Sequence, residues 1–364
     1  MTHSAPHILF DISGHGFGHA AMTTPIINAL HQARPDIRIT IRTKAPQSFL
    51  DQTLDVDYEL IAESSDFGMI MHDAFRVDTQ ASLSAYQEAH RHWPDKVSLQ
   101  ADKLRQLQPD LVISNISYLS LAAAAQAGIP SLAYSCLNWA EIFNDYFKDN
   151  SDAQAIYQQM LAAYRQTELF MRPAPAMPML GLDTLLIGPV ASLGQNRHGE
   201  ICDTLNLDSD TKLTIVSLGG VSTHLSCQHW PKLSKHHYLV PGDVHHADQR
   251  ADVSSLEQTN IPFHDALASA SLYLTKPGYG AFSGAACHGI PVIYTERDQW
   301  PEQIHLVEWL KQQVPCGKIS QQQLQHGDFT QALVSLLNKP RPKATPSDGT
   351  QQSVEQIIKL LTSC

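Results

Sequence analysis

The stretch that decides the fold runs Tyr273-Leu-Thr-Lys-Pro-Gly-Tyr-Gly-Ala-Phe-Ser-Gly-Ala-Ala-Cys-His-Gly-Ile-Pro-Val-Ile-Tyr-Thr-Glu296. It reads as a short apolar strand, a glycine turn, a helix and a second strand. Glycines directly after a strand let the phosphates of a ligand approach bare backbone N–H groups, and the positive end of the helix dipole faces them. Gly278 and Gly280 stand where this interpretation needs them. The alternative is an ordinary strand-to-helix turn that binds nothing.

The same order of elements occurs in both halves of the chain. Residues 7–13 form an apolar run that leads into Gly14-His-Gly-Phe-Gly-His19 and then a helical pattern, and residues 213–218 lead into Gly219 and Gly220. Strands that alternate with helices predict an α/β protein with two Rossmann-like, doubly wound parallel sheets. Because ligands of such sheets bind at the carboxyl ends of the strands, we expect the site in the cleft between two domains.

The 364 residues suit two domains, and the boundary is predicted near residues 172–195, at a proline-rich connector. Three prolines stand within residues 172–181, which therefore cannot form a long regular element. We expect an N-terminal domain over 1–180, a C-terminal domain over 181–340, and a loop with a closing helix over 341–364.

Composition excludes several classes of protein. A net charge of −11 argues against a general nucleic-acid binder. No apolar run is long enough for a transmembrane helix, and the N-terminus lacks the features of a signal peptide, so a cytoplasmic protein is expected. The six cysteines contain no Cys-x-x-Cys pair and are expected to be reduced and structural.

The N-terminal glycine loop carries two histidines, His15 and His19. His19 would stand near the start of the following helix, and the pKa of histidine suits the removal of a proton from a sugar hydroxyl near neutral pH. Both histidines could instead cap or fill a turn, but their place in a glycine loop at a strand end favours function, more for His19 than for His15. The glycine spacing does not give the Gly-x-Gly-x-x-Gly fingerprint of a dinucleotide site.

Two carboxylate–amide pairs follow the second strand of the opening stretch: Asp298 with Gln299, and Glu302 with Gln303. Such pairs can hydrogen-bond several hydroxyls of a pyranose, although acids at a helix start are also favoured by the dipole. A histidine-rich segment raises the possibility of zinc, but no ligand pattern is present and we expect no metal. Its residues are His224, Cys227, His229, His236, His237, His245 and His246.

With these residues in view, the chain resembles the two-Rossmann-domain (GT-B) nucleotide-sugar glycosyltransferases, in particular the peptidoglycan N-acetylglucosaminyltransferase and UDP-glycosyltransferase types. Its opening Gly-His-Gly-Phe-Gly-His-Ala20 is also similar to the N-terminal region of L-arabinokinases, as is Lys-Pro-Gly-Tyr-Gly over residues 276–280. The resemblance covers roughly residues 7–310 and implies inverting, metal-independent transfer from a nucleoside-diphosphate sugar to a hydroxyl acceptor. That sugar nucleotide would be a co-substrate, and no cofactor is expected.

The resemblance assigns a role to each candidate residue. It implies that the acceptor lies on the N-terminal domain, with His19 as the base, and the donor on the C-terminal domain. The acceptor-side loop comprises Gly14, His15, Gly16, Phe17 and Gly18. The donor diphosphate would be bound by Gly219, Gly220, Lys276, Gly278, Tyr279, Gly280 and Ser283. The donor sugar would be read by Asp298, Gln299, Glu302 and Gln303.

One departure from the family concerns the ribose. Relatives commonly have Ser-Glu where this chain has Ser283-Gly284, and their glutamate holds the ribose hydroxyls. Met22 also stands where the arabinokinase-like pattern has arginine. Glycosyl transfer is the first hypothesis. Epimerisation or hydrolysis of a nucleotide sugar is the second, and a non-catalytic sugar-nucleotide-binding module is the third, with Gly284 as its main support.

Overall fold

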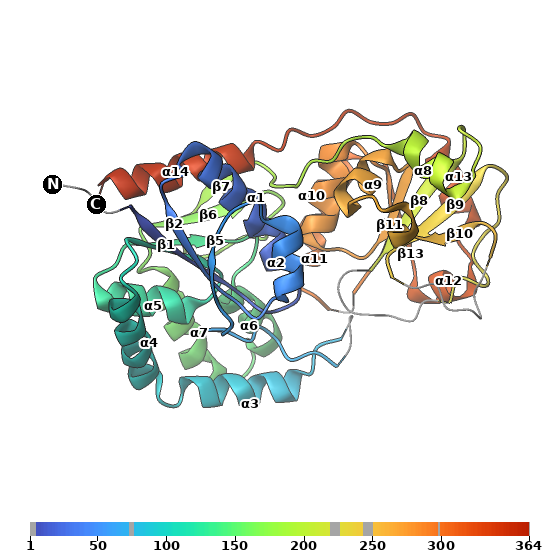
Figure 1. The fold of residues 1–364 in the computed structure, drawn as a ribbon. Coiled ribbons are helices and arrows are strands. Elements are labelled where there is room, and N and C mark those ends of the chain that lie inside the picture. The colour runs from blue at the N-terminus through green and yellow to red at the C-terminus, as the bar shows by residue number, and fades with distance from the viewer. Residues whose placement is uncertain (1–4, 73–75, 219–225, 243–249, 298, 364) are drawn as a thin grey trace. The chain divides into compact units, whose positions relative to one another are not determined.

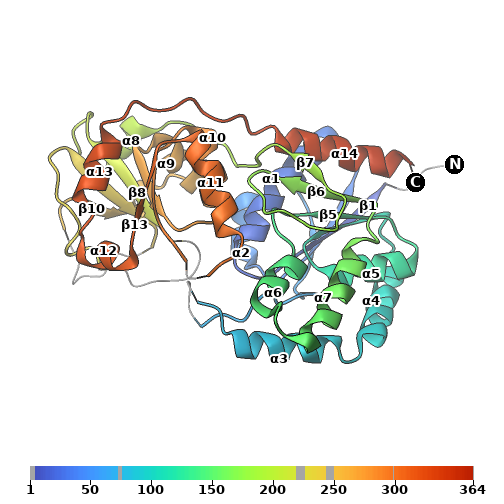
Figure 2. The ribbon, with the colours of Figure 1, turned by 180° about the vertical axis from the view of Figure 1, so that it is seen from behind.

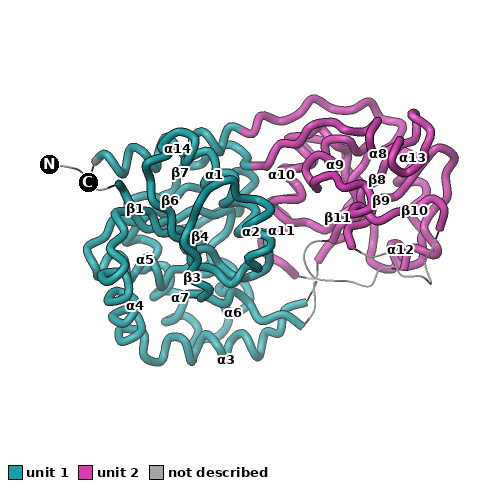
Figure 3. Tube along the Cα trace, viewed as in Figure 1, with its two compact units in different colours: residues 1–190, 348–364 teal, residues 191–347 magenta. Residues whose placement is uncertain are grey.

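The structure, a computed structural model, describes residues 5–72, 76–218, 226–242, 250–297 and 299–363. The chain divides into two compact units, coloured separately in Figure 3. Unit 1 contains residues 1–190 and 348–364, and unit 2 contains residues 191–347. The chain thus leaves unit 1, forms unit 2, and returns to unit 1.

Unit 1 is built on a seven-stranded parallel sheet in the order β3-β2-β1-β4-β5-β6-β7. All six residues of β1 are buried, and β1 pairs with β2 on one side and β4 on the other, which makes it a central strand. The strands are β1 (His7–Ile12), β2 (Arg38–Arg42), β3 (Glu59–Ile61), β4 (Leu111–Asn115), β5 (Ser131–Tyr134), β6 (Leu169–Pro173) and β7 (Leu185–Ile187).

Helices cover both faces of this sheet, with α1 and α14 on one face and α4, α5 and α7 on the other (Figures 1 and 2). A dry core forms where Leu9 and Val112 of the sheet meet Ala101 and Leu104 of α4 and Ala123 of α5. The helices are α1 (Gly18–Ala33), α2 (Gln47–Thr53), α3 (Thr79–His90), α4 (Trp93–Leu107), α5 (Tyr118–Ala127), α6 (Trp139–Phe147), α7 (Ser151–Tyr164) and α14 (Gly349–Ser363).

Unit 2 has a six-stranded parallel sheet in the order β10-β9-β8-β11-β12-β13. The strands are β8 (Lys212–Ser217), β9 (His236–Val240), β10 (Val253–Ser255), β11 (Leu272–Thr275), β12 (Val292–Thr295) and β13 (Cys316–Ile319). The helices are α8 (His198–Leu205), α9 (Phe263–Ser269), α10 (Tyr279–His288), α11 (Gln303–Gln313), α12 (Gln321–His326) and α13 (Thr330–Leu337), and a 3₁₀ helix spans Leu256–Thr259.

Two doubly wound parallel sheets confirm the predicted fold class. Unit 1 extends to residue 190, which lies inside the predicted boundary region of 172–195 but past residue 180, where the N-terminal domain was expected to end. After the prolines, β7 still pairs with β6 and lengthens the first sheet. The closing helix α14 also belongs to unit 1, where it packs on α1 and β7. Within the described part of the chain, every helix is too short or too polar to traverse a bilayer.

Candidate active site

His19 lies at the carboxyl edge of the unit 1 sheet, in the first turn of α1, and is buried. The glycine loop that follows β1 leads directly into this turn. The ring nitrogen Nδ1 of His19 lies 2.8 Å from Oδ1 of Asn115, the last residue of the adjacent strand β4. Since β1 and β4 are parallel neighbours with Ile12 opposite Asn115, both groups stand at the strand edge where such sheets bind ligands.

The hydrogen bonds of Asn115 determine which nitrogen of His19 carries the proton. Nδ2 of Asn115 donates to the carbonyl oxygen of His19 across 3.2 Å and to Oγ1 of Thr23 across 2.9 Å. Because a carbonyl oxygen can only accept, the amide must present its own oxygen to the ring. His19 Nδ1 is therefore the donor, and Nε2 is the basic nitrogen of the imidazole.

A second polar cluster at this edge is centred on Asp66, in the loop after β3. Oδ1 accepts from the hydroxyl of Ser13 at 2.8 Å, and Oδ2 accepts from Nε1 of Trp139 at 2.7 Å. Burial raises the pKa of Asp66 to about 6, although these hydrogen bonds act to lower it. Asp66 thus joins the segments that follow three strands, β1, β3 and β5.

Trp139 is fully buried and lies between Asp66 and the two histidines. Its ring centroid lies 5.2 Å from that of His15, in an edge-on arrangement, and 5.6 Å from that of His19. Gly68 has φ +62°, and a Cβ there would come within 2.8 Å of both His15 and Trp139. A side chain at position 68 would therefore displace the rings of His15 and Trp139.

The rest of the acceptor-side loop is partly exposed. Gly14, Gly16 and Gly18 are exposed, and Gly16 has φ +73°, a conformation that favours glycine. Phe17 stacks on Phe49 of α2, with ring centroids 5.3 Å apart.

A buried ion pair links β1 and β2 near the carboxyl edge of the sheet. Arg42, at the end of β2, donates to both carboxylate oxygens of Asp11 in β1 across 3.0 Å. The hydroxyls of Ser65 and Ser120 also donate to Asp11, so that the loop beside Asp66 is tied to the sheet. The pair is fully hydrogen-bonded, as a buried charge pair must be to be tolerated.

Sequence reasoning identified His19 but missed Asn115 and Asp66. The available signal for Asn115 was its position at the end of a buried strand, where polar residues are unexpected unless they meet a ligand or a partner. Asp66 carries no motif, because its role depends on contacts with residues far along the chain. Three aromatic residues of α6, Trp139, Phe143 and Phe147, are buried core residues, as their helical spacing favours, whereas Tyr146 is partly exposed.

In unit 2, the turn at Gly278 lies between β11 and α10, and Gly278 is the N-cap residue of α10. No side chain caps this end of the helix. Among the described residues, a Cβ at Gly280 would meet nothing within 4 Å, and one at Gly278 would meet only the oxygen of Lys276 at 4.0 Å. Packing against the described part of unit 2 therefore does not require these glycines, and their bare backbone leaves room there for a ligand at the positive end of the helix.

Tyr279 and Ser283 of the same motif point into the protein. Tyr279 is 5% exposed and Ser283 is fully buried. The hydroxyl of Ser283 has no hydrogen-bond partner among the described residues. Gly219 and Gly220, the other predicted phosphate-binding residues, lie outside the described residues.

Gly284, where the sequence departs from the family pattern, faces a neighbouring helix. A Cβ there would lie 3.2 Å from Cδ2 of Leu267, so this side of α10 packs against α9. A side chain at position 284 therefore fits only if Leu267 shifts by a few tenths of an ångström. The ribose contact that relatives make from this position is absent here.

The carboxylate–amide segment is held by its own side chains. Oε2 of Glu302 accepts from Nε1 of Trp300 at 3.0 Å, and Oε1 of Gln303 accepts from the backbone N–H of Arg297 at 2.6 Å. Glu302 is 5% exposed, whereas Gln299 is exposed and has φ +51°. Asp298 lies outside the described residues.

Two described histidines of the proposed zinc segment, His236 and His237, have structural partners, whereas His229 is exposed. His236 and His237 lie in β9 and hydrogen-bond Thr214 of β8 and Ser254 of β10, each at 2.8 Å. Burial lowers the pKa of His236 to about 4. In the part of the chain that the structure describes, no three His, Cys, Asp or Glu side chains group to hold a metal. His224, His245 and His246 lie outside it.

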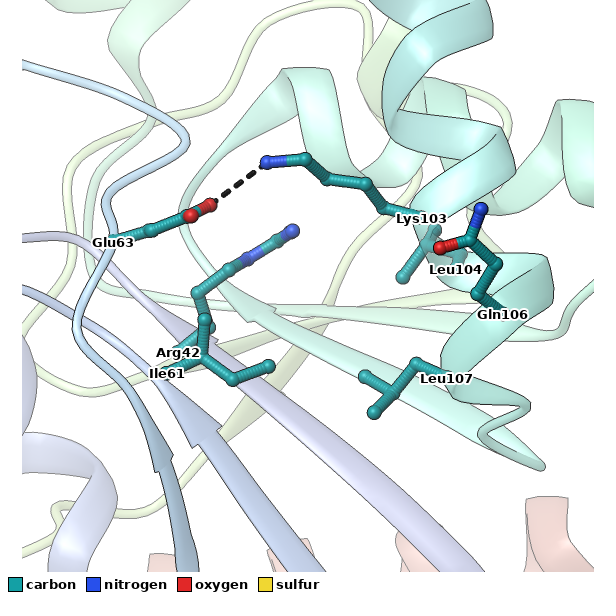
Figure 4. Close-up of a pocket in the computed structure, with 7 residues that line it drawn as sticks. All are labelled: Arg42, Ile61, Glu63, Lys103, Leu104, Gln106 and Leu107. Carbon is teal, nitrogen blue, oxygen red and sulfur yellow. Dashed lines mark hydrogen bonds and ion pairs between the residues drawn. The ribbon is translucent and has the colours of Figure 1, made fainter.

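A cavity of about 330 Å³ in unit 1 lies between α4 and the ends of β2 and β3 (Figure 4). It contains none of the predicted site residues, and an ion pair of 2.9 Å between Lys103 and Glu63 joins two of its side chains. It is lined by Arg42, Ile61, Glu63, Lys103, Leu104, Gln106 and Leu107.

A cavity of about 270 Å³ in unit 2 contains the cations Lys212, Lys339 and Arg341. Lys212 donates to the carbonyl oxygen of Leu337 at the end of α13, and Arg341 donates to that of His288 at the end of α10. These two cations stabilise the negative ends of helices, so a structural role accounts for them.

The comparisons with known proteins agree with this architecture. Residues 6–162 match the family described as Glycosyl transferase family 1. The chain is 25% identical over 318 residues to L-arabinokinase of Arabidopsis thaliana, covering 85% of this chain but only 30% of that protein. Among solved structures, it is similar to the glycotransferase of kitacinnamycin (16% identity, TM-score 0.64, 98% of this chain and 99% of that one). It is also similar to CalG4, the calicheamicin glycosyltransferase (19% identity, TM-score 0.63, 98% and 94%).

The predicted resemblance to the GT-B glycosyltransferases and to L-arabinokinases is thereby confirmed. At these identities the structural likeness shows the GT-B fold. The family match over residues 6–162 supports sugar transfer as the class of activity.

Proposed function

We propose that the protein is a glycosyltransferase that moves a sugar from a nucleoside-diphosphate sugar to a hydroxyl acceptor, with inversion at the anomeric carbon. The single observation that carries this proposal is the His19–Asn115 hydrogen bond, which leaves Nε2 as a base at the edge of a parallel sheet. We assign the acceptor to unit 1 and the donor to unit 2.

In this reaction Nε2 of His19 removes the proton of the acceptor hydroxyl. The acceptor oxygen forms a bond to the anomeric carbon while the bond from that carbon to the diphosphate oxygen breaks, and the leaving diphosphate takes the electron pair. A single displacement of this kind inverts the anomeric configuration. Asn115 acts as a positioning residue, because it holds the ring in the tautomer that the proton transfer needs.

The leaving diphosphate gains negative charge as the bond breaks. The backbone N–H groups at the start of α10 and the ammonium group of Lys276 would stabilise it, as preorganised donors do. We propose that this positive charge makes transfer independent of a metal ion.

The test is product formation across a panel of nucleotide sugars and hydroxyl acceptors, followed by chromatography, with wild type compared with His19→Ala and His19→Gln. Loss of turnover in both variants, with unchanged melting temperature, is expected. Turnover that survives in both would remove His19 from the role of base.

A second candidate is a sugar-nucleotide-binding module without turnover, favoured by the position of Gly284 against Leu267. Calorimetric binding of a nucleotide sugar, without transfer to any acceptor of a broad panel and without hydrolysis or epimerisation by NMR, would support this candidate instead.

A further inference from the structure

The cavity of about 270 Å³ in unit 2 lies at the amino edge of the sheet, where the proposed reaction places no substrate. Lys212 begins β8, and Ser271 and Pro291 directly precede β11 and β12, so the cavity lies where three neighbouring strands begin. The turn at Gly278 follows the other end of β11. Because β11 has four residues, and a strand rises about 3.3 Å per residue, the two edges are about 13 Å apart. The cavity is therefore separate from the proposed donor site.

Three cations line this cavity, and contacts with helix ends account for only two of them. Lys212 and Arg341 donate to carbonyl oxygens, whereas Lys339 makes no hydrogen bond or ion pair with the described residues. Both printed bonds of Arg341 come from Nη2, so its Nε and Nη1 are available as donors there. None of the three pairs with a carboxylate of the described residues, and burial alone lowers the pKa of Arg341. The helix-end contacts thus hold two cations in place without neutralising any of the three.

The lining of the cavity suits an anion with more than one negative charge. Acids outnumber Lys and Arg by 36 to 25 in the whole chain, yet no acid lines this cavity. Three positive charges around one cavity repel one another, and a bound anion offsets that repulsion. A guanidinium fork beside ammonium groups is a donor set that matches phosphate, and Asn196 and Ser271 add neutral donors. Since one water takes up about 30 Å³ of liquid, the cavity has room for a phosphate group and a small substituent.

The cavity also touches both segments that connect unit 2 with the rest of the chain. Asn196 and His198 belong to the segment that enters unit 2 at residue 191, and Lys339 and Arg341 belong to the segment that leaves it at residue 347. An anion bound to side chains of both segments would join them within unit 2. Binding should therefore raise the melting temperature of the protein.

We propose that this cavity binds a phosphate group, as inorganic phosphate or as the phosphomonoester of a small molecule, at a site separate from the donor site. Arg341 and Lys339 donate to the phosphate oxygens, and Lys212 adds positive charge from the start of β8. The bound phosphate joins the entering and leaving segments of unit 2.

Calorimetry with inorganic phosphate tests this site in the full chain, at an ionic strength held constant with sodium chloride. Lys339→Met should weaken binding by about 3–5-fold, as expected for an exposed charge pair. Arg341→Lys keeps the charge but loses the planar fork, and should weaken binding by about 10-fold. Lys343→Met is the matched control, because Lys343 is an exposed cation of the same segment that does not line the cavity. It should bind phosphate as wild type does.

Glycerol 3-phosphate distinguishes the two sources of the phosphate group. Tighter binding than that of inorganic phosphate would assign the site to a phosphomonoester, and weaker binding would assign it to the free ion. Melting temperatures without ligand show whether each variant is folded.

Lys276→Met separates this site from the donor turn. Phosphate binding that is lost in Lys276→Met but unchanged in Lys339→Met and Arg341→Lys would overturn the proposal. An equal loss in Lys343→Met, or no binding of either probe by folded wild type, would also overturn it. Because the measurement uses no nucleotide sugar, a failure of the proposed glycosyl transfer would leave its result unaffected.

Discussion

The side-chain oxygen of Asn115 accepts a hydrogen bond from Nδ1 of His19 across 2.8 Å. An amide can orient an imidazole and select its tautomer, but it carries no charge that would stabilise the imidazolium formed after proton transfer. Substitutions at position 115 should therefore change the basicity of the His19 imidazole.

Replacing Asn115 with leucine should separate orientation from donor binding. The variant loses the acceptor for Nδ1, and we expect kcat to fall by about 100-fold, the lower end of the range for general-base catalysis. The KM for the nucleotide sugar should stay the same, because we assign the donor to unit 2. Steady-state kinetics with each substrate varied in turn would measure both, and a rise in donor KM alone would contradict this role.

Asn115→Asp should shift the pH profile. A carboxylate at hydrogen-bond distance stabilises the imidazolium, so the pKa that governs the acidic limb of kcat/KM should rise by about 1 unit or more. The pH–rate profiles of wild type and variant measure this shift, with Asn115→Leu as the uncharged reference. An unmoved acidic limb would mean that a group other than His19 titrates there.

Asp66 should make stability depend on pH in a specific direction. Its pKa is raised to about 6 in the folded protein, so the folded state holds a proton that the unfolded state has already released between about pH 4 and 6. Its contribution to stability therefore falls as pH rises through this interval.

The matched variant is Asp66→Asn, which does not titrate and can still accept from Trp139. Between pH 4.5 and 7.5, the stability of Asp66→Asn relative to wild type should grow by about 1–3 kcal/mol. Urea unfolding at the two pH values measures the difference. A constant difference would show that Asp66 titrates normally.

His236 should act in the same pH region with the opposite sign. Its pKa is lowered to about 4 by burial. Between about pH 6.5 and 4, the unfolded state therefore binds a proton at His236 and the folded state does not. Stability should fall as pH drops from 6.5 to 4, and His236→Gln, which can still bond Thr214, should reduce this loss by about 2–3 kcal/mol. Urea unfolding at pH 7 and 4.5 measures the stability of wild type and variant. An equal loss of stability between the two pH values in both proteins would refute this prediction.

Gly284→Glu tests whether the missing ribose contact can simply be restored. Because position 284 faces Leu267, we expect the variant to lose about 2–4 kcal/mol of stability from overpacking and burial of a carboxyl group, with no gain in nucleotide affinity. The loss should be smaller in a Leu267→Ala background, where α9 leaves room. Tighter nucleotide binding by a fully stable Gly284→Glu protein would contradict this packing argument.

The fold could be predicted because its signals are local. The glycine turns at Gly278 and after β1 mark strand-to-helix junctions, and their alternation with apolar runs implies parallel sheets. The exact division of the chain could not be predicted in the same way. Leu185 and Leu186 are exposed, so β7 does not look like a core strand, and no local feature of α14 tells which sheet it covers.

Local signals also identified part of the site, whereas residues that depend on distant contacts were missed. His19 stands in a motif of adjacent residues, whereas Asn115 reaches it only through strand pairing and Asp66 only through contacts with Ser13 and Trp139. At Gly284 the sequence showed that the usual carboxylate is missing, and the structure adds that a Cβ there would crowd Leu267.

Helix α14 also bears on the order in which the protein can be completed during synthesis. Domains nearer the N-terminus generally finish folding first. Here the chain of unit 2 is complete at residue 347, whereas unit 1 still lacks the helix that covers α1 and β7. Val354 and Ile357 of that helix are buried in unit 1, so a nascent chain presents an uncovered apolar surface there until α14 has left the ribosome.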